Sequence, residues 1–197
     1  MRLQQFITEK TEDTEKIIEM LHKDCSEYFD NIQFGVKSFR GHKGISGIYE
    51  KITPRTDRKP RDMPLEVHER LSKSLKRKFK WNPREEGVFV TGVLEEAEGF
   101  GTPYYFYPSN GFKMVWNTKI FDIFEYLRAH GYVKKGKVID DEYVYEISKI
   151  MRSYKSGGPK DINTALQSGN EVAFKCKFYY LVDIDFVTNN FDDIYYN

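Results

Sequence analysis

The sequence predicts an α+β fold whose sheets are largely antiparallel. Strand-like and helix-like segments are both abundant among the 197 residues, but they do not alternate strictly, as they would in a doubly wound parallel sheet. Two aromatic runs, PYYFYP at 103–108 and FKMVWN at 112–117, are separated only by SNG, and this spacing predicts an antiparallel hairpin. A chain of this length is expected to form a single domain over residues 1–197.

The first third of the chain predicts a helix, a strand and a loop. Thr and acidic residues open the segment 11–31, and its apolar residues recur near helical spacing, so we expect an N-terminal helical segment within residues 1–30. The run IQFGVKSFRG at 32–41 is strand-like. Residues 42–62 contain Gly and Pro throughout and predict an irregular loop.

A basic loop and helix follow at residues 54–84. Asp62 is the predicted helix N-cap, and Pro64 lies in the first turn. One face carries apolar residues and a histidine at helical spacing, namely Leu65, His68, Leu71, Leu75 and Phe79. Residues 54–84 hold eleven Lys and Arg against four Asp and Glu, a charge of +7 in a chain with a net charge of +1. Cations beside Trp81 suit a nucleic-acid backbone with a stacked base, and a solvated helix face is the common alternative.

The second half of the chain contains further short strands and helices. The segment VFVTG at 88–92 predicts a strand, and LEEAEGF at 94–100 predicts a short helix. Helices are expected at 117–131 and 140–157, each ending at a glycine. The segment 170–187 predicts one long strand or two shorter strands.

Several classes of protein are disfavoured by what the sequence lacks. It contains no P-loop, no GxGxxG after a strand, no HExxH, no paired CxxC and no GxSxG. Cys25 and Cys176 are far apart and lack metal-ligand spacing, so we expect no metal. No run approaches the roughly 20 apolar residues that span a bilayer, and the N-terminus does not resemble a signal peptide. We therefore expect a cytoplasmic protein that does not enter a membrane.

Three polar residues stand at predicted strand ends. Arg40 ends a strand in SFRG, where its rigid fork of donors suits a phosphate or a carboxylate. Thr91 stands at a strand-to-helix corner in FVTG, and Glu171 enters a strand after the Gly-Asn turn in QSGNEVAF. Taken singly, each is more commonly structural: an ion pair, a helix cap and a solvated carboxylate.

In this order, the three motifs resemble the Arg–Ser/Thr–Glu pattern of the cholera-toxin-like ADP-ribosyltransferases. The resemblance covers about residues 34–187, and in VTGVLEEAEGFG the hydroxyl motif is followed by a short helix with Ala97 and then by Phe100. It implies two small, mainly antiparallel sheets that form a cleft, with flanking helices. It also implies a mono-ADP-ribosyltransferase, which transfers ADP-ribose from NAD+ to a macromolecular target and releases nicotinamide.

The resemblance implies a role for each residue of the pattern. Glu171 would oppose the positive charge that develops on the ribose, Arg40 would bind the pyrophosphate or the adenosine side, and Thr91 would orient the glutamate. The implied cofactor-binding residues are Arg40, Gly41, Thr91, Gly92, Phe100, Tyr104 and Tyr105. One of the aromatic residues would stack on nicotinamide. NAD+ is a substrate in this scheme, and no metal is implied.

The chain departs from the family pattern at two places. Val90-Thr91-Gly92 stands where Ser-Thr-Ser is usual. Arginine-modifying members carry a second Glu two residues before the catalytic one, where this chain has Gly169, and Gln167 is the nearest substitute. A base amine or another side chain is therefore a better expected acceptor than a protein arginine. The expected target-binding residues are Lys76, Arg77, Trp81, Gln167 and Gly169, and the target is RNA, DNA or protein.

Two other functional classes stay open. The chain could be a non-catalytic nucleic-acid-binding protein that uses the basic helix 64–80, or a tyrosine-rich protein-interaction module. A small transferase of this kind would suit a toxin, a phage effector or a defence protein, and an inhibitory protein would then be a further partner. Turnover of labelled NAD+ separates the transferase from both alternatives. Strongly salt-dependent binding of RNA or DNA without turnover would favour the first alternative.

Overall fold

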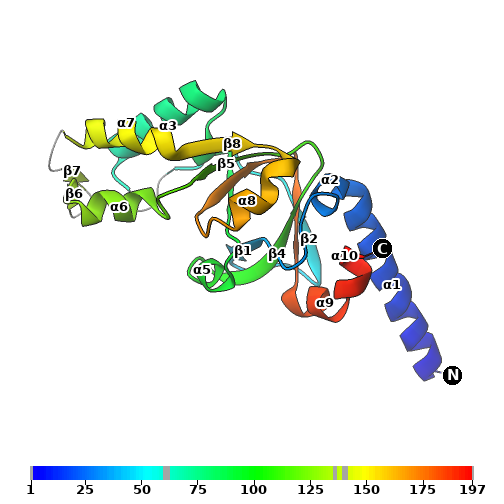
Figure 1. The fold of residues 1–197 in the computed structure, drawn as a ribbon. Coiled ribbons are helices and arrows are strands. Elements are labelled where there is room, and N and C mark those ends of the chain that lie inside the picture. The colour runs from blue at the N-terminus through cyan, green and yellow to red at the C-terminus, as the bar shows by residue number, and fades with distance from the viewer. Residues whose placement is uncertain (1, 60–62, 135–136, 139–141, 197) are drawn as a thin grey trace.

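The computed structural model describes residues 2–59, 63–134, 137–138 and 142–196, which form an α+β fold with two small sheets and flanking helices (Figure 1). The first sheet has the order β1-β4-β10-β2, with β1 Phe39–His42, β4 Thr102–Pro108, β10 Tyr179–Val182 and β2 Tyr49–Ile52. The second has the order β3-β9-β5-β8, with β3 Val88–Val90, β9 Val172–Lys175, β5 Lys113–Asn117 and β8 Tyr154–Gly157. Every pairing in both sheets is antiparallel, so the predicted fold class is confirmed.

The helices gather in two groups on either side of the sheets (Figure 1). One group comprises α1 Arg2–Asp24, α2 Ser26–Phe29, α8 Ile162–Leu166, α9 Ile184–Asn189 and α10 Phe191–Tyr195. The other comprises α3 Leu65–Phe79, α6 Ile123–Ala129 and α7 Tyr143–Ser153, with the small hairpin β6 Val133–Lys134 and β7 Lys137–Val138. The short helices α4 Pro83–Glu86 and α5 Leu94–Glu98 flank β3, and a 3-10 turn at Pro159–Asp161 precedes α8.

Each helix group covers its own hydrophobic core. The larger core joins both sheets to α1, α2, α8, α9 and α10, and its largest side chains are aromatic, including Tyr28, Phe106 and Phe174. The smaller core lies among α3, α6 and α7. The predicted apolar face of the basic helix is wrong at one position, because Leu65 is 60% exposed and Val67 is buried instead. None of the described helices is long and apolar enough to cross a bilayer.

The predicted hairpin between the two aromatic strands does not form, because β4 and β5 belong to different sheets. The turn between them is bound by the end of α1 and by α2. Asn110 donates from its backbone N–H to Asp24 O (2.9 Å), and the Gly111 N–H donates to Glu27 Oε2 (2.7 Å). These contacts hold the turn against the helices, and the chain crosses to the second sheet.

The segment 170–187 also passes from one sheet to the other. It forms two strands, β9 and β10, which lie in different sheets, so the interpretation as one long strand is wrong. The connection between β4 and β5 and the connection between β9 and β10 are hydrogen-bonded to each other. The Ser109 N–H donates to Phe178 O (3.0 Å), and the Phe178 N–H donates to Ser109 Oγ (3.3 Å). These two hydrogen-bonded connections join the first sheet to the second.

Four further expectations need correction. The loop predicted at 42–62 contains the edge strand β2, which pairs with β10. The strand predicted at 32–41 is limited to β1. The N-terminal helix is divided at Cys25 into α1 and α2, and the helix predicted at 140–157 ends at Ser153, where β8 begins. The predicted cap Asp62 and the predicted start of the latter helix at 140–141 lie outside the described residues.

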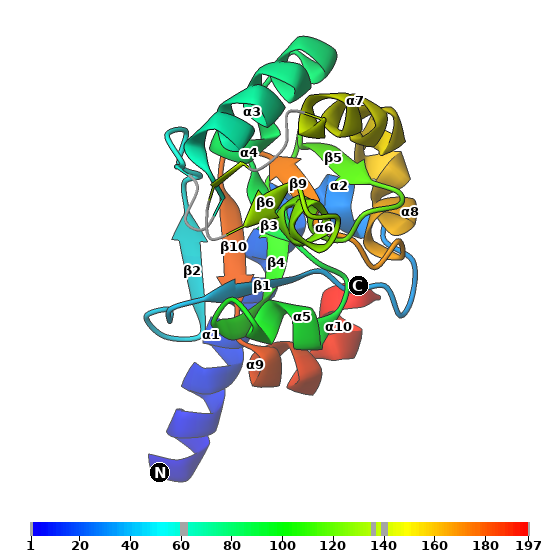
Figure 2. The same ribbon diagram turned by 90° about the vertical axis from the view of Figure 1, so that its left-hand side faces the viewer.

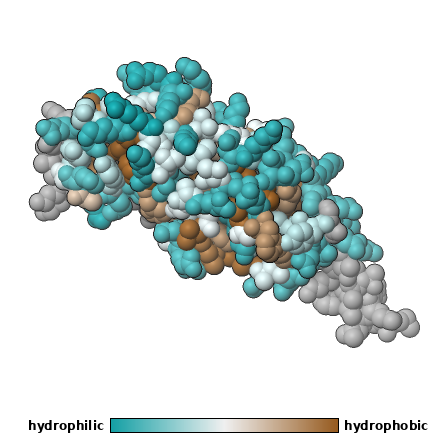
Figure 3. Space-filling model, in the orientation of Figure 1, coloured by the Kyte–Doolittle hydropathy of each residue, from teal (hydrophilic) through white to brown (hydrophobic). Residues whose placement is uncertain are grey.

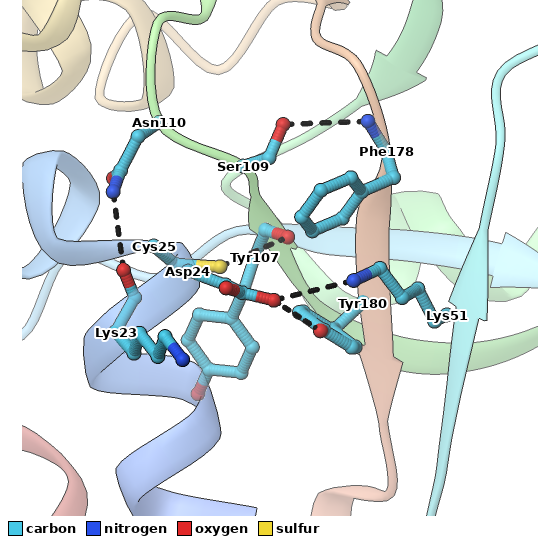
Figure 4. A network of polar contacts seen from close by, with 9 residues as sticks. All are labelled: Lys23, Asp24, Cys25, Lys51, Tyr107, Ser109, Asn110, Phe178 and Tyr180. Carbon is cyan, nitrogen blue, oxygen red and sulfur yellow. Dashed lines mark hydrogen bonds and ion pairs between the residues drawn. The ribbon is translucent and has the colours of Figure 1, made fainter.

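A polar network fastens α1 to the first sheet (Figure 4). Asp24 Oδ2 accepts hydrogen bonds from the Tyr180 hydroxyl (2.6 Å) and from Lys51 Nζ (3.3 Å). The Lys51 ammonium also lies 3.6 Å from the centroid of the Phe178 ring. The Tyr180 hydrogen bond, followed by Lys51, holds the pKa of Asp24 below its ordinary value, although burial opposes this. The ionised carboxylate therefore stabilises the docked helix.

We expect Asp24→Asn to lower the free energy of unfolding by about 1 kcal/mol at pH 7, because a charged hydrogen bond and a partly buried ion pair are weakened. Since the folded-state pKa is depressed, this contribution is present above the unfolded-state pKa and is lost as the pH falls through the folded-state value. Urea unfolding at pH 7 and at pH 3 measures both effects. The control is Asp13→Asn, which breaks an exposed pair with Lys16 and should change little. Equal effects of the two substitutions would contradict the assigned role of Asp24.

Candidate functional site

The second sheet presents two different faces. Its buried face packs into the larger core through Val88, Val90, Val172, Phe174, Met114 and Trp116. The alternate residues of the same strands line a cavity, namely Phe89, Ala173, Val115 and Asn117. Successive side chains of a strand point to opposite faces, so the period of two predicts this division once the register is known.

The strand register sets four polar side chains in one row across the sheet. Val90 and Trp116 both pair with Val172, on either side of β9. Thr91, Glu171 and Asn117 are the next residues along the three chains, and Asn117 pairs with Tyr154 of β8. All four of these side chains line the cavity. Glu171 therefore lies between a hydroxyl on one neighbouring strand and an amide on the other.

The cavity has a volume of about 420 Å³, within the range that small-molecule and cofactor sites occupy. It is lined by the row just described, by β1, by the segment after β2, and by α3, α5 and the start of α6. In Figure 2, α3 lies toward the top and α5 toward the bottom, and the strands lie between them. The cavity wall therefore contains strands of both sheets as well as helices.

Arg40 reaches the cavity because β1 is joined to the end of β3. Phe39 and Thr91 exchange two backbone hydrogen bonds, of 2.7 and 3.0 Å. Arg40 Nη1 donates to Phe89 O (2.6 Å), and the guanidinium carbon lies 5.9 Å from the centroid of the Tyr179 ring. Its Nε is buried and has no hydrogen-bond partner in the structure. The guanidinium is therefore held by the fold, with one buried donor that has no hydrogen-bond partner.

Two more arginines line the same cavity. Arg58 Nη1 donates to Gly87 O (2.9 Å), and its guanidinium lies over the Phe89 ring. Arg84 makes only long contacts, from Nε to His68 Nδ1 (3.5 Å) and from Nη2 to the Met63 sulfur (3.6 Å). Burial, followed by the nearby Arg40, lowers the pKa of Arg58. Clustered cations that repel one another in a cavity indicate a site for an anion.

These arginines have no carboxylate partner at ion-pair distance within the described part of the chain. The more common interpretation of such an arginine, as half of a structural ion pair, is therefore wrong for Arg40 within the described part of the chain. Three guanidinium groups without such partners match a ligand that carries two negative charges, such as a pyrophosphate.

Glu171 is a carboxyl group that titrates near neutrality. Burial raises its pKa to about 7, Arg84 opposes this, and Asp122 raises it further. Arg58 and Arg40 also favour the ionised form. A partly buried carboxyl group with a perturbed pKa, set among cations in a cavity, is a candidate functional group rather than a solvated strand-entry residue.

Thr91 is both a turn residue and a wall of the cavity. Its Oγ1 accepts a hydrogen bond from the Val93 N–H (3.1 Å), which fixes the chain where α5 begins. The residue is buried and also lines the cavity. The interpretation of Thr91 as a helix cap is wrong, because Val93 is the N-cap of α5 and no side chain caps this helix. The hydroxyl instead closes a turn before the helix, and it still has a proton to donate.

The glycines of the motifs permit close packing around the cavity. A Cβ on Gly41, which lines the cavity, would collide with the Ala97 carbonyl oxygen in α5. A Cβ on Gly92 would lie 2.5 Å from Leu166 O in α8, although Gly92 itself is not part of the cavity wall. Phe100, after α5, is 68% exposed and lines the cavity, as the sequence predicts for the aromatic residue of the motif.

Besides Gly92, several of the predicted ligand residues lie outside the cavity wall. Tyr104 and Tyr105 are buried in the larger core, because they belong to the middle strand β4 of the first sheet. Gln167 is exposed at the end of α8, and Gly169 turns the chain with a φ of +69°. Neither residue lines the cavity, so Gln167 does not supply the second acidic or amide group there.

The proposed nucleic-acid face is only partly present. Lys76 and Arg77 are exposed on α3, but Trp81 is buried and the Lys175 ammonium lies 5.5 Å from the centroid of its ring. Trp81 is therefore not available to stack on a base. Lys78 Nζ donates to Met151 O and to Tyr154 O, at 2.5 and 2.8 Å, so this cation binds the end of α7.

The cavity residues that the sequence interpretation missed include Arg84, Asn117, Asp122 and Tyr154. Arg84 follows an Asn-Pro turn directly before β3, and a basic residue beside a motif strand was the available signal. Asn117 and Tyr154 enter the site only through strand register. Asp122 is the N-cap of α6, and nothing local distinguishes it from other caps.

Groups that could ligate a metal do not occur in the described ranges, where no three His, Cys, Asp or Glu residues are close enough together. Comparisons of the chain with models of protein families, with curated proteins and with solved structures found no match.

Proposed function

We propose that this protein is a mono-ADP-ribosyltransferase, which cleaves the bond between nicotinamide and ribose in NAD+ and transfers ADP-ribose to a macromolecular acceptor. One observation carries the proposal. Arg40, Thr91 and Glu171 stand far apart in the sequence, yet all three line one cavity that has three arginines in its wall.

The arginines suit the pyrophosphate of NAD+. Arg40, Arg58 and Arg84 come from three separate segments, and each presents a planar fork of donors that can bind phosphate oxygens in pairs. The unpartnered Nε of Arg40 gains a hydrogen bond when an anion binds. The exposed ring of Phe100 offers an apolar face for nicotinamide at the edge of the cavity.

Glu171 suits the reacting end of NAD+. When the bond between ribose C1′ and nicotinamide N1 breaks, the electron pair leaves with nicotinamide and positive charge develops on the ribose. An ionised carboxylate beside the ribose stabilises that charge and accepts a hydrogen bond from a ribose hydroxyl. Thr91, on a neighbouring strand, would hold the carboxylate in place.

Incubation of the purified protein with NAD+ tests the proposal. We expect release of free nicotinamide, measured by chromatography, and addition of the ADP-ribose mass to protein or RNA after brief expression in cells, measured by mass spectrometry. Absence of both nicotinamide release and ADP-ribose addition would overturn the transferase assignment. Salt-sensitive nucleic-acid binding through Lys76 and Arg77 would then become the leading alternative.

Substitutions of Thr91 separate its two roles. We expect Thr91→Ser to preserve nicotinamide release, because the hydroxyl still accepts from the Val93 N–H and keeps a proton that it can donate toward the glutamate. Thr91→Ala should cost about 1 kcal/mol of stability as a lost hydrogen bond of the turn and should also reduce turnover per folded molecule by about 10-fold, a loss equivalent to a weak hydrogen bond. Steady-state kinetics and urea unfolding of the same samples measure both. A stability loss with unchanged turnover would limit Thr91 to the turn.

A further inference from the structure

One short segment forms a continuous part of the cavity wall. Residues 117–122 connect β5 to α6, and Asn117, Ile120, Phe121 and Asp122 all line the cavity. Asn117 Oδ1 accepts from the backbone N–H groups of residues 119 and 120, at 2.8 and 2.9 Å. The Thr118 N–H and hydroxyl both donate to Ser153 O. The segment is therefore held in a defined conformation.

The amide of Asn117 points to a ligand. Its oxygen is occupied by two backbone donors, so the Nδ2 group must face the other way, and the orientation of the amide is determined by the hydrogen bonds. Asn117 is 3% exposed and lines the cavity, and its Nδ2 makes no hydrogen bond of ordinary geometry, although the amide lies near enough to the Tyr154 hydroxyl to lower the pKa of that group against the effect of burial. A buried amide donor without a hydrogen-bond partner costs free energy, and a bound molecule that accepts this hydrogen bond would remove the cost.

Asp122 brings a second carboxylate to the same cavity. Its Oδ1 caps α6 by accepting from the Glu125 N–H (2.8 Å), and the side chain forms no ion pair within the described ranges. Its charge raises the pKa of Glu171, so the two carboxyl groups interact across the cavity. Beside Asp122, the ring of Phe121 is 42% exposed and can cover a planar group that enters from solvent.

We propose that Asp122 is the general base of the transfer reaction, and that residues 117–122 form the subsite for the acceptor. This inference rests on the proposed function. The acceptor is an N–H or O–H nucleophile: its lone pair forms the new bond to ribose C1′ as the bond to nicotinamide breaks, and its proton passes to the Asp122 carboxylate and then to solvent. Glu171 keeps its separate task of opposing the ribose charge.

This arrangement replaces a group that the chain lacks near Glu171. The position two residues before it is Gly169, which has no side chain, and Gln167 lies outside the cavity. Asp122 supplies the second carboxylate from a different segment, the start of α6. The acceptor is thus recognised between β5 and α6 rather than by the turn before β9.

Asp122→Asn separates a base from a helix cap. Asn is as good an N-cap as Asp, so the substitution should leave urea unfolding unchanged. Loss of a general base should lower nicotinamide release in water by about 10²-fold, with the KM for NAD+ preserved. If Asp122 acted only through its charge, its removal would lower the pKa of Glu171, leave more of that carboxyl ionised at pH 7, and keep or raise the rate. The two roles therefore predict opposite changes.

Sodium azide provides the decisive second measurement. Azide is a nucleophile with no proton to lose, so it does not need a base. We expect azide to restore nicotinamide release by Asp122→Asn and to form the azido-ADP-ribose adduct, detected by mass spectrometry. It should not restore Glu171→Gln, which lacks the group that opposes the ribose charge.

A matched control and the wild-type protein make each outcome decisive. Glu125→Gln removes an exposed carboxylate from the same helix, where it pairs with Arg128, and should leave the rate unchanged. If the wild type releases nicotinamide and Asp122→Asn is as fast, or is slow without recovery in azide, Asp122 is not the base, and the transferase assignment stands. If the wild type releases none and adds no ADP-ribose to any target, the proposed function and this inference are both overturned.

Discussion

Replacing Glu171 with Gln should lower nicotinamide release from NAD+ by about 10²–10³-fold, because it removes a preorganised charge that acts in the transition state. Gln keeps the size of the side chain and its place between Thr91 and Asn117. Binding of NAD+ should therefore change little, since ground-state contacts with the arginines persist. Single-turnover kinetics combined with calorimetric titration of NAD+ would separate the two effects.

The pH dependence of the wild type provides an independent check. Because burial raises the pKa of Glu171 to about 7, the active carboxylate should accumulate as the pH rises through 7, and kcat/KM should rise with it. The folded-state pKa lies above the ordinary value, so the contribution of this group to stability decreases as the pH rises from the ordinary value to about 7, and the full loss is present above pH 7. Glu171→Gln should then be at least as stable as the wild type at pH 8.

Full turnover by Glu171→Gln would remove the carboxylate from the mechanism. A loss of turnover that matched a loss of folded protein would instead make Glu171 a structural residue. The expected combination, an inactive protein that is as stable as the wild type, is the signature of a group that serves chemistry at the expense of stability.

Replacing Arg40 with Lys should weaken NAD+ binding by about 10–100-fold, the equivalent of losing one charged hydrogen bond, while kcat changes little. Lys keeps the charge, but its donors lie on one nitrogen at the end of a flexible chain, and it lacks the planar fork that Arg40 presents while Nη1 is bound to Phe89 O. Because phosphate contacts hold substrate and transition state alike, the effect should appear in KM. Titration with ADP-ribose, which contains the same pyrophosphate, should show the same loss.

Arg55→Ala is the matched control for this experiment. Arg55 belongs to the same basic loop as Arg58, but it pairs with Asp57 at the surface and does not line the cavity. Its removal should leave NAD+ binding unchanged. A decrease in kcat at constant KM for Arg40→Lys would show that Arg40 acts on the reacting groups and not on the phosphates.

The face drawn in Figure 3 offers little support for a large protein-interaction surface. Hydrophilic residues cover most of that face, and the apolar residues appear in small separate groups. Many of the tyrosines that suggested an interaction module, such as Tyr28, Tyr107 and Tyr180, are buried in the larger core. Abundant tyrosine in this chain therefore reflects packing, since an aromatic ring can fill a core and bond its hydroxyl at the edge.

Some of the site could be predicted from the sequence because its signals are local. Arg40, Thr91 and Glu171 each stand where a strand meets a turn, and that position needs only a short window of sequence to identify. The helix with Ala97 and the aromatic Phe100 belong to the same kind of signal. The class of fold was also predictable, because the strands and helices do not alternate.

Other parts of the site depend on which strands pair, and the sequence does not contain that information locally. Tyr104 and Tyr105 were expected at the ligand, but β4 lies in the middle of the first sheet and buries both. The hairpin was expected from a three-residue spacing, but contacts with α1 and α2 redirect the turn at Asn110. A one-residue change in register would turn every side chain of a strand to the other face.

By itself, the sequence determined the class of fold, most of the helices and strands, and the three polar residues at strand ends, because these depend on neighbouring residues along the chain. Only the tertiary structure decided that Asn117 and Asp122 join Glu171 and that Trp81 and Gln167 do not. The physical reason is that antiparallel register and helix packing are properties of segments distant in sequence. Their contacts are chosen by the burial of a common core, and no short window of sequence contains both partners.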